Sequence, residues 1–279
     1  MPRISVIIPC YNQGAYVDEA IASVLAQTFQ DFEIIVINDG STDPATVTAL
    51  NAVTYPKTRV IHTSNLGLPG ARNLGIQNAS GEFILPLDAD DKIAPTYLEK
   101  ALSVITTQPA VGIVYCKAWM FGTRSGPWDL PDYKFPDILL SPRIHCTALF
   151  RKTDWEKVGG YSSEMIHGWE DYDFWLSLIE MGREVHCIPE VLFYYRQHES
   201  SMITALDKDR ASALTNILFR RHRKLYEDNL GTLFGSVLLQ ESNTRFLKNS
   251  LDFKLGRAVL APFREIARFF KRLKKPSAK

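Results

Sequence analysis

The feature that most constrains the fold of this chain is a short apolar run that leads directly into three carboxylates. Residues 83–87 (FILPL) are followed by residues 88–91 (DADD), and a glycine and a proline bound the whole segment. A continuous apolar run of this length predicts a β-strand that is buried on both faces. The three acids then lie at its carboxyl end, which is the edge of an open α/β sheet where ligands bind.

The acidic cluster has two interpretations. Three carboxylates within four residues repel one another unless a cation or a hydrogen-bond donor lies between them, and Mg²⁺ and Mn²⁺ prefer oxygen ligands, so the cluster suggests a site for a metal-bound diphosphate. The alternative is an acidic turn before a helix that begins at Pro95. A lone Asp-X-Asp pattern favours the alternative, because such short motifs often match by chance.

Strands and helices alternate upstream of this cluster. Apolar runs predict strands at residues 4–8, 32–37 and 60–62, and helical apolar spacing predicts helices at 16–25, from Pro44, and at 71–78. This alternation predicts a parallel, doubly wound sheet. The loops after the strands then meet at one edge, where Tyr11, Asp39 and the acidic cluster are expected around one crevice. No Gly-x-Gly-x-x-Gly fingerprint follows the first strand and no Gly-Lys-Ser/Thr loop occurs, so a nucleotide would be held by side chains and a metal.

Downstream of the cluster the prediction is a helix at 95–107, strands at 111–116 and 145–150, a short helix capped by Thr153, and a strand pair at 185–188 and 191–195 bent at Pro189. Residues 118–144 are predicted to form a long loop rich in aromatic residues, and a loop of this length is either a functional segment or evidence against the assignment of the elements around it. Its aromatic side chains either stack on sugar rings or pack on the core as a small lid.

Two further polar positions lie in this half of the chain. Glu170, Asp171 and Asp173 begin a predicted helix, where its dipole would stabilise them without any other role. His198 follows the last predicted strand. A lone surface histidine most often has no special role, but histidine is also a common metal ligand, and this position returns the chain to the same crevice.

Charge is unevenly distributed along the chain. The net charge is +1, but residues 255–279 hold 8 of the 32 basic and 1 of the 31 acidic residues, which leaves 24 basic and 30 acidic residues in the first 254. Such a basic tail indicates an anionic partner, either nucleic acid or membrane. Residues 207–249 show helical periodicity, and residues 259–275 combine an apolar face with a basic one, which favours an anionic membrane surface. The alternative is a helix whose apolar side packs on the body.

The remaining composition points to a cytoplasmic protein. The four cysteines are far apart and show no metal-binding spacing, so they are predicted to be buried thiols in a reducing compartment. There is neither a signal-like amino terminus nor a run of 18 apolar residues. We therefore expect a cytoplasmic chain, peripheral at the inner face of the membrane through residues 259–275.

Six short motifs occur in one order along the chain: Pro9-Cys10-Tyr11-Asn12, Asn38-Asp39-Gly40-Ser41-Thr42-Asp43, Gly70-Ala71-Arg72-Asn73, Asp88-Ala89-Asp90-Asp91, Trp169-Glu170-Asp171 and Tyr195-Arg196-Gln197-His198. In this order and spacing the chain resembles family 2 glycosyltransferases of the GT-A fold over residues 3–204. Each motif is weak by itself, but together they reverse the preference for a simple acidic turn.

The resemblance implies an α/β GT-A fold, in which a Rossmann-like, mostly parallel central sheet is flanked by helices and followed by a C-terminal helical extension. It implies a glycosyltransferase domain at 1–204, with a nucleotide-sugar half at 1–117 and an acceptor half at 118–204. The helical extension would then occupy residues 205–279.

The resemblance also assigns donor binding to a set of residues: Pro9, Tyr11, Asn12, Asp39, Gly40, Arg72, Asp88, Ala89 and Asp90. Tyr11 would stack on the nucleotide base, and Asp39 would accept a hydrogen bond from the base, a contact that suits uracil. The planar guanidinium of Arg72 would lie near the base or the phosphates.

For the reaction, the resemblance implies Mn²⁺ or Mg²⁺ held by Asp90, Asp91 and His198, although three acids leave open which of Asp88, Asp90 and Asp91 ligates the ion. Asp171 would be the general base of an inverting transfer, with Glu170 beside it. Base and metal must then lie on opposite sides of the sugar.

The expected function is metal-dependent, inverting transfer of a sugar from a nucleotide-diphosphate donor, most plausibly a UDP-sugar, to a hydroxyl of a sugar or lipid-linked acceptor in cell-surface polysaccharide or glycolipid synthesis. This is a hexosyltransferase activity of class EC 2.4. The alternative is a catalytically silent nucleotide-sugar-binding or scaffold protein. A nucleotidyltransferase is disfavoured because the chain lacks a Gly-rich amino-terminal loop with Arg and Lys, and nucleic acid is not expected as a partner.

Overall fold

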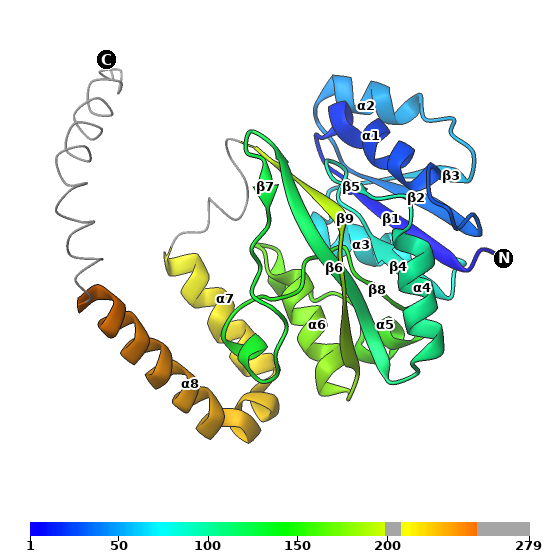
Figure 1. Cartoon of the computed structure of the whole chain (residues 1–279). Helices are drawn as coiled ribbons and strands as arrows, with labels where there is room; N and C mark the ends of the chain where they lie inside the picture. Colours follow the sequence, from blue (N-terminus) through cyan, green and yellow to red (C-terminus); the bar gives the residue numbers. More distant parts are fainter. Residues whose placement is uncertain (199–207, 250–279) are drawn as a thin grey trace, which may run out of the picture. The chain divides into compact units, whose positions relative to one another are not determined.

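The computed structural model describes residues 1–198 and 208–249 (Figure 1). Contacts along the chain define two compact units, residues 1–228 and residues 229–279. The domain boundary expected after residue 204 and the amphipathic helix expected at 259–275 both lie outside the described residues. The described part of the second unit is the helical stretch 229–249 at the end of α8 (Arg223–Asn249).

The first unit is built on a mixed nine-stranded sheet, counted over its described residues, with the order β3-β2-β1-β4-β8-β6-β9-β5 and with β7 paired to β6. The first four strands are parallel, as predicted: β1 (Ile4–Cys10), β2 (Phe32–Asp39), β3 (Thr58–Thr63) and β4 (Phe83–Pro86). Every residue of β1, β2 and β4 is buried, which agrees with their continuous apolar sequences.

The second half of the sheet departs from the parallel pattern. Its strands are β5 (Lys92–Ile93), β6 (Val111–Gly122), β7 (Gly126–Pro127), β8 (Leu149–Arg151) and β9 (Glu184–Gln197). β8 runs antiparallel to both β4 and β6, whereas β6 and β9 are parallel. The doubly wound parallel sheet is therefore confirmed for the first four strands, and the second half is mixed.

Three strand boundaries differ from the predicted ones. The two strands expected around Pro189 form one strand, β9, because a bulge opposite Cys116 and Lys117 takes up Pro189 and the ladder continues. β6 extends to Gly122, so the aromatic loop is shorter than expected. β8 begins only at Leu149, because Ala148 N–H donates to the carbonyl of Cys146 in a local turn.

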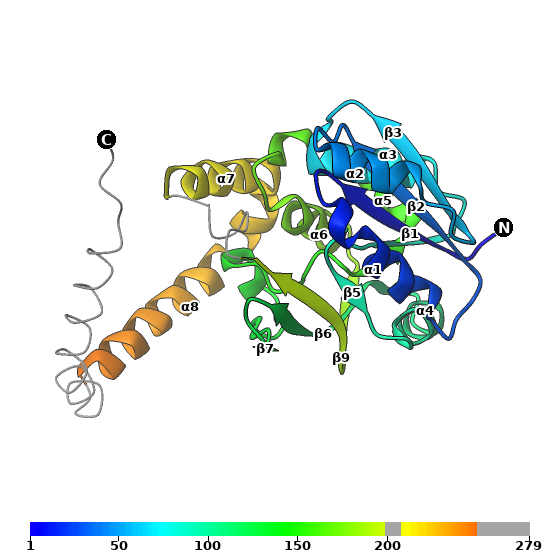
Figure 2. The ribbon, with the colours of Figure 1, turned by 90° about the horizontal axis from the view of Figure 1, so that it is seen from above.

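The helices cover both faces of the sheet. α1 (Gly14–Leu25) and α4 (Tyr97–Thr107) lie on one face, and α3 (Gly67–Gln77) and α6 (Glu170–Glu180) lie on the other, as Figure 2 shows. The remaining described helices are α2 (Pro44–Asn51), α5 (Lys152–Val158), α7 (Lys208–Arg221) and the single turns η1 (Asp137–Leu140) and η2 (Ser163–Met165). No helix in the described part of the chain has both the length and the apolar character to cross a bilayer.

The helices occur where the sequence predicts them, but their first residues often differ from the predicted ones. α2 begins at Pro44 with Asp43 as its N-cap, as expected. α3 begins at Gly67 rather than Ala71, since Pro69 is tolerated in a first turn. α4 begins at Tyr97, two residues after Pro95, and the residue before α5 is Arg151, so Thr153 does not cap that helix.

Candidate active site

The ends of β1, β2 and β4 meet at one edge of the sheet. Cys10 is the register partner of Asn38, so Tyr11 and Asp39 follow neighbouring strands side by side. Ile7 pairs with Pro86, and the charge of Asp90 contributes to raising the pKa of the Cys10 thiol, after the larger effect of burial. The structure thus brings the three predicted loops to one place.

Tyr11 and Asp39 differ in exposure. Tyr11 is 46% exposed at the end of β1, which leaves its ring accessible to a ligand. Asp39 is buried, its Oδ1 accepts a 2.6 Å hydrogen bond from the Leu66 amide, and burial raises its pKa. Asp39 therefore also anchors the loop that leads into α3.

The neighbouring donor-site candidates shape the loops. Asn12 has a left-handed backbone (φ 55°), and its Oδ1 accepts hydrogen bonds from the amides of Thr42 (2.8 Å) and Asp43 (2.9 Å), which ties the loop after β1 to the start of α2. Gly40 has φ 66°, and a Cβ there would meet the amide nitrogen of Asn65 at 2.5 Å, so only glycine fits. Pro9 and Ala89 are both buried in the protein interior.

The acidic cluster after β4 spreads into three environments. Asp88 Oδ1 accepts a 2.7 Å hydrogen bond from Arg72, and Asp90 Oδ2 lies 2.8 Å from His198 Nε2. Asp91 is fully buried, its Oδ1 accepts from the Arg196 amide at 2.7 Å, and its Oδ2 has no hydrogen-bond partner in the described structure. Burial, reinforced by the neighbouring carboxylates, raises the pKa of both Asp90 and Asp91.

Arg72 connects the two halves of the site. Its side chain is 1% exposed, with one terminal nitrogen 2.7 Å from Asp88 and the other 2.5 Å from Glu170. The two acids are far apart in sequence, on β4's loop and on α6. The guanidinium thus donates to two carboxylates, and its expected place near the base or phosphates of a donor stays a prediction.

Asp171 follows Glu170 in the first turn of α6 and is half-buried. Burial and the adjacent Glu170 raise its pKa to about 7, while the guanidinium of Arg72 acts in the opposite direction. Asp88 also raises this pKa, after the larger effects of burial and Glu170. A carboxyl with a pKa near neutrality is suited to general base catalysis.

The fit of a divalent ion to this site is mixed. Asp90 and His198 are in contact, and the unpartnered Oδ2 of Asp91, with the raised pKa values of both acids, indicates negative charge that a cation would offset. Within residues 1–198 and 208–249, however, no three His, Cys, Asp or Glu side chains are already gathered in a group that could hold a metal. The donor set suits Mg²⁺ or Mn²⁺, with ligand oxygens completing the shell.

The aromatic side chains of residues 118–144 divide between the two interpretations, stacking on sugar rings and packing on the core. Trp128 packs on the core side, with its ring 4.4 Å from that of Tyr195 and 6.4 Å from that of His145. Trp119 and Phe135 are 38% and 42% exposed. The packed lid accounts for Trp128, and the exposed rings are the ones available to a sugar.

Two residues of the site were given no role by the sequence. Arg196 donates from Nε to the carbonyl of Asp90 at 2.8 Å and lies over the rings of Tyr16 and Phe121. Cys146 Sγ lies 3.6 Å from Asp88 Oδ2. Arg196 lies within a quoted motif, which was a signal, whereas nothing in the sequence around Cys146 points to Asp88.

Comparisons with known proteins agree with this geometry. The model of the family described as Glycosyl transferase family 2 matches residues 5–159. A glycosyltransferase of Rickettsia typhi whose role is uncharacterized is 33% identical over 220 residues, which is 74% of this chain and 68% of that protein. The match extends beyond half of each chain.

Solved structures share the fold. S. aureus TarS 1-349 in complex with UDP-GlcNAc superposes with a TM-score of 0.64 at 19% identity, over 91% of this chain and 78% of that one. The mannosyltransferase PcManGT from Pyrobaculum calidifontis, in complex with GDP-Man and Mn²⁺, gives 0.59 at 19% identity, over 99% and 88%. At these identities the likeness is one of fold, and it matches the curled α/β sheet with flanking helices described above.

Proposed function

The chain belongs to glycosyl transferase family 2, and from this premise we propose that it transfers a sugar from a nucleotide-diphosphate donor to an acceptor hydroxyl with inversion at the anomeric carbon. The observation that carries the proposal is the pairing of Arg72 with both Asp88, which follows β4, and Glu170, the residue before Asp171 in α6.

On the donor side, Tyr11 stacks on the base and Asp39 accepts a hydrogen bond from it. The accessible ring of Tyr11 and its register beside Asp39 support this assignment. UDP is the preferred nucleotide because an acceptor oxygen at Asp39 suits the N–H of uracil. Pro9, Asn12, Gly40 and Ala89 shape the loops around the donor.

At the diphosphate, Asp90 and His198 would hold a divalent ion, and Asp91, whose Oδ2 has no hydrogen-bond partner in the described structure, would be the third ligand. When bound, such an ion neutralises the charge that grows on the leaving diphosphate. Arg72 keeps Asp88 in place beside this site instead of binding a phosphate with all its donors.

On the acceptor side, Asp171 takes the proton of the acceptor hydroxyl while the hydroxyl oxygen forms its bond to the anomeric carbon. The bond from that carbon to the diphosphate breaks, and the nucleoside diphosphate leaves with the electron pair. Glu170 does not compete for the proton, because it is 6% exposed and engaged by Arg72.

The test replaces Asp171 with asparagine and measures donor binding and turnover separately. A general base contributes about 10²- to 10⁴-fold in rate, so Asp171→Asn is expected to lose that much of its UDP release from a UDP-sugar with Mn²⁺ while binding UDP like the wild type. Asp209→Asn, an exposed change on α7, is the matched control. Equal loss of binding and turnover would remove Asp171 from the role of base.

The proposed acceptor rests on the family, and the proposed location rests on the basic residues 255–279, which lie outside the described part of the chain. A sugar or lipid-linked acceptor in surface polysaccharide or glycolipid synthesis agrees with a cytoplasmic enzyme whose basic residues 255–279 meet an anionic membrane. The prediction is salt-sensitive binding to anionic but not neutral liposomes.

A catalytically silent binding protein is the competing function, and it would bind UDP without releasing it from UDP-sugars.

A further inference from the structure

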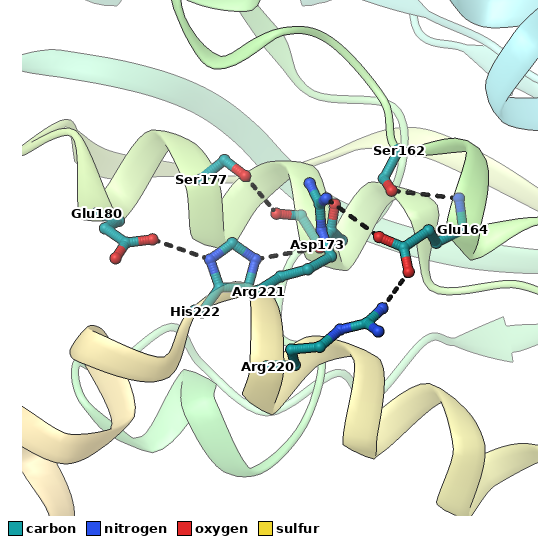
Figure 3. A network of polar contacts seen from close by, with 8 residues as sticks. All are labelled: Ser162, Glu164, Asp173, Ser177, Glu180, Arg220, Arg221 and His222. Carbon is teal, nitrogen blue, oxygen red and sulfur yellow. Dashed lines mark hydrogen bonds and ion pairs between the residues drawn. The ribbon is translucent and has the colours of Figure 1, made fainter.

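A cluster of charged side chains joins α6 to the junction between α7 and α8. Figure 3 shows the ring of His222 between Asp173 and Glu180 of α6, with Nε2 3.1 Å from Asp173 Oδ1 and Nδ1 3.0 Å from Glu180 Oε2. Arg221 Nε donates to the same Asp173 oxygen at 2.7 Å. All of these residues belong to the first compact unit.

The centre of the cluster is buried, so removing one of its partners destabilises the fold more than breaking a surface ion pair does. The side chains of Asp173 and His222 are 1% and 3% exposed. Burial opposes the charged form of both groups, but their hydrogen bonds outweigh it, so the pKa of Asp173 is lowered and that of His222 is raised. Removing one partner of such a buried pair leaves an uncompensated charge behind.

Asp173 is tied directly to the turn that carries the proposed base. Its amide donates to the carbonyl of Trp169 at 2.9 Å, which closes the first turn of α6 around Glu170 and Asp171. Trp169 itself has a left-handed backbone (φ 60°) and offers no side-chain cap to the helix. The turn therefore depends on contacts from outside α6.

A second contact from the same junction reaches the other neighbour of Asp171. Tyr172 donates its hydroxyl to the carbonyl of Ile138 on η1, and Tyr226 donates to the next carbonyl, that of Leu139, at 3.0 Å. Tyr226 lies in the first residues of α8. Asp173 is thus held by Arg221 and His222, and Tyr172 is held by η1, where its hydroxyl also interacts with that of Tyr226.

We propose that Arg221, His222 and Tyr226 are positioning residues for glycosyl transfer, which hold the first turn of α6 so that the carboxylate of Asp171 faces the acceptor hydroxyl. This rests on the proposed role of Asp171. None of the three contacts the donor loops in the described structure, so they act through the geometry of α6 alone.

The charged groups around His222 come from four helices. Asp173 and Glu180 face it from α6, Arg221 adjoins it on α7, and Lys157 of α5 lines a cavity of about 400 Å³ that also reaches His222 and Glu180. Lys224 adds a further positive charge near Glu180. The cavity is also lined by Ser177 on the last turns of α6 and by Met181 at its C-cap, and none of its lining residues belongs to the proposed donor site.

The test uses the full chain with UDP-GlcNAc, Mn²⁺ and water as the acceptor, unless a donor panel identifies a better UDP-sugar. His222→Ala is expected to keep the wild-type Kd for UDP and to lose about 10²-fold in kcat, the size of effect that follows a misplacement of about 1 Å. Added imidazole fills the space beside the cavity and restores part of kcat. Tyr226→Phe removes one hydroxyl only and is expected to lower kcat severalfold with no change in UDP binding.

Arg223→Gln is the matched control, because Arg223 adjoins His222 but pairs with Glu227 on the exposed side of α8. It should keep the wild-type kcat and Kd. A merely structural role predicts fewer UDP-binding molecules with an unchanged kcat per binding site, and that result for His222→Ala and Tyr226→Phe would overturn the proposal. If Asp171→Asn remains active, the proposed function fails; if Asp171→Asn is inactive while both variants turn over normally, only this inference fails.

Discussion

The two halves of the sheet achieve their geometry in different ways. In residues 4–86 the site loops follow parallel strands whose register alone places Tyr11 beside Asp39. In residues 111–228 the strands are mixed in direction, and α6, which carries the proposed base, is contacted by long-range charged partners, with Arg72 on one side and Arg221 and His222 on the other. The loops of residues 4–86 are placed by backbone hydrogen bonds between strands, whereas α6 is held by its buried apolar side chains together with a few buried charges.

This difference predicts that replacing Arg72, which contacts both Asp88 and Glu170, lowers the stability of both parts of the site. Arg72→Gln leaves Asp88 and Glu170 without their cation, and breaking a buried pair in this way costs about 3–5 kcal/mol. Urea unfolding should show this loss in the free energy of unfolding. Arg3→Gln, in a surface pair with Glu82, should cost no more than about 1 kcal/mol. If Arg72→Gln loses no more free energy of unfolding than Arg3→Gln, the contacts of Arg72 to Asp88 and Glu170 do not hold these two parts of the site together.

A glycine tests the backbone-determined half. Gly40→Ala combines a left-handed backbone with a Cβ that would lie 2.5 Å from the Asn65 amide, so a destabilisation of about 1–3 kcal/mol and weaker UDP binding are expected. Gly159→Ala shares the positive φ but meets no atom within 4 Å, so it measures the backbone cost alone. If the two variants lose equal stability and bind UDP equally well, close packing at Gly40 is unimportant.

The smallest expected effect is the dependence on pH of the stability that the pairing of His222 contributes. The pKa of His222 is raised in the folded state, so its pairing contributes stability that is fully present below the ordinary pKa of about 6.5 and is lost as pH rises through the higher folded value. Melting temperatures from pH 5.5 to 8.5 should therefore show a gap between the wild type and His222→Gln that narrows with increasing pH. A difference in melting temperature that widens with increasing pH would contradict a raised pKa of His222 in the folded state.

The sequence predicted the strands of residues 4–86 well, because apolar runs and turn residues reflect local preferences. It predicted β1, β2, β4 and the meeting of their loops, and also that Glu170 begins a helix. It missed the antiparallel β8 and the continuity of β9 across Pro189, since both depend on which strand lies alongside. The resemblance named Arg72 and Asp171 but could not show that Arg72 joins Asp88 to Glu170, because that contact spans 98 residues.

The most direct measurement of the central claim, that Asp171 is the base of a site shared by both halves, is the pH dependence of UDP release from a UDP-sugar with Mn²⁺. Asp171 must be ionised to accept a proton and its pKa is raised to about 7, so the wild-type rate should increase with pH through neutrality. Asp171→Asn should show a low rate without this rise. A wild-type rate that does not change between pH 5.5 and 8.5, or an asparagine variant with the same profile as the wild type, would contradict the account.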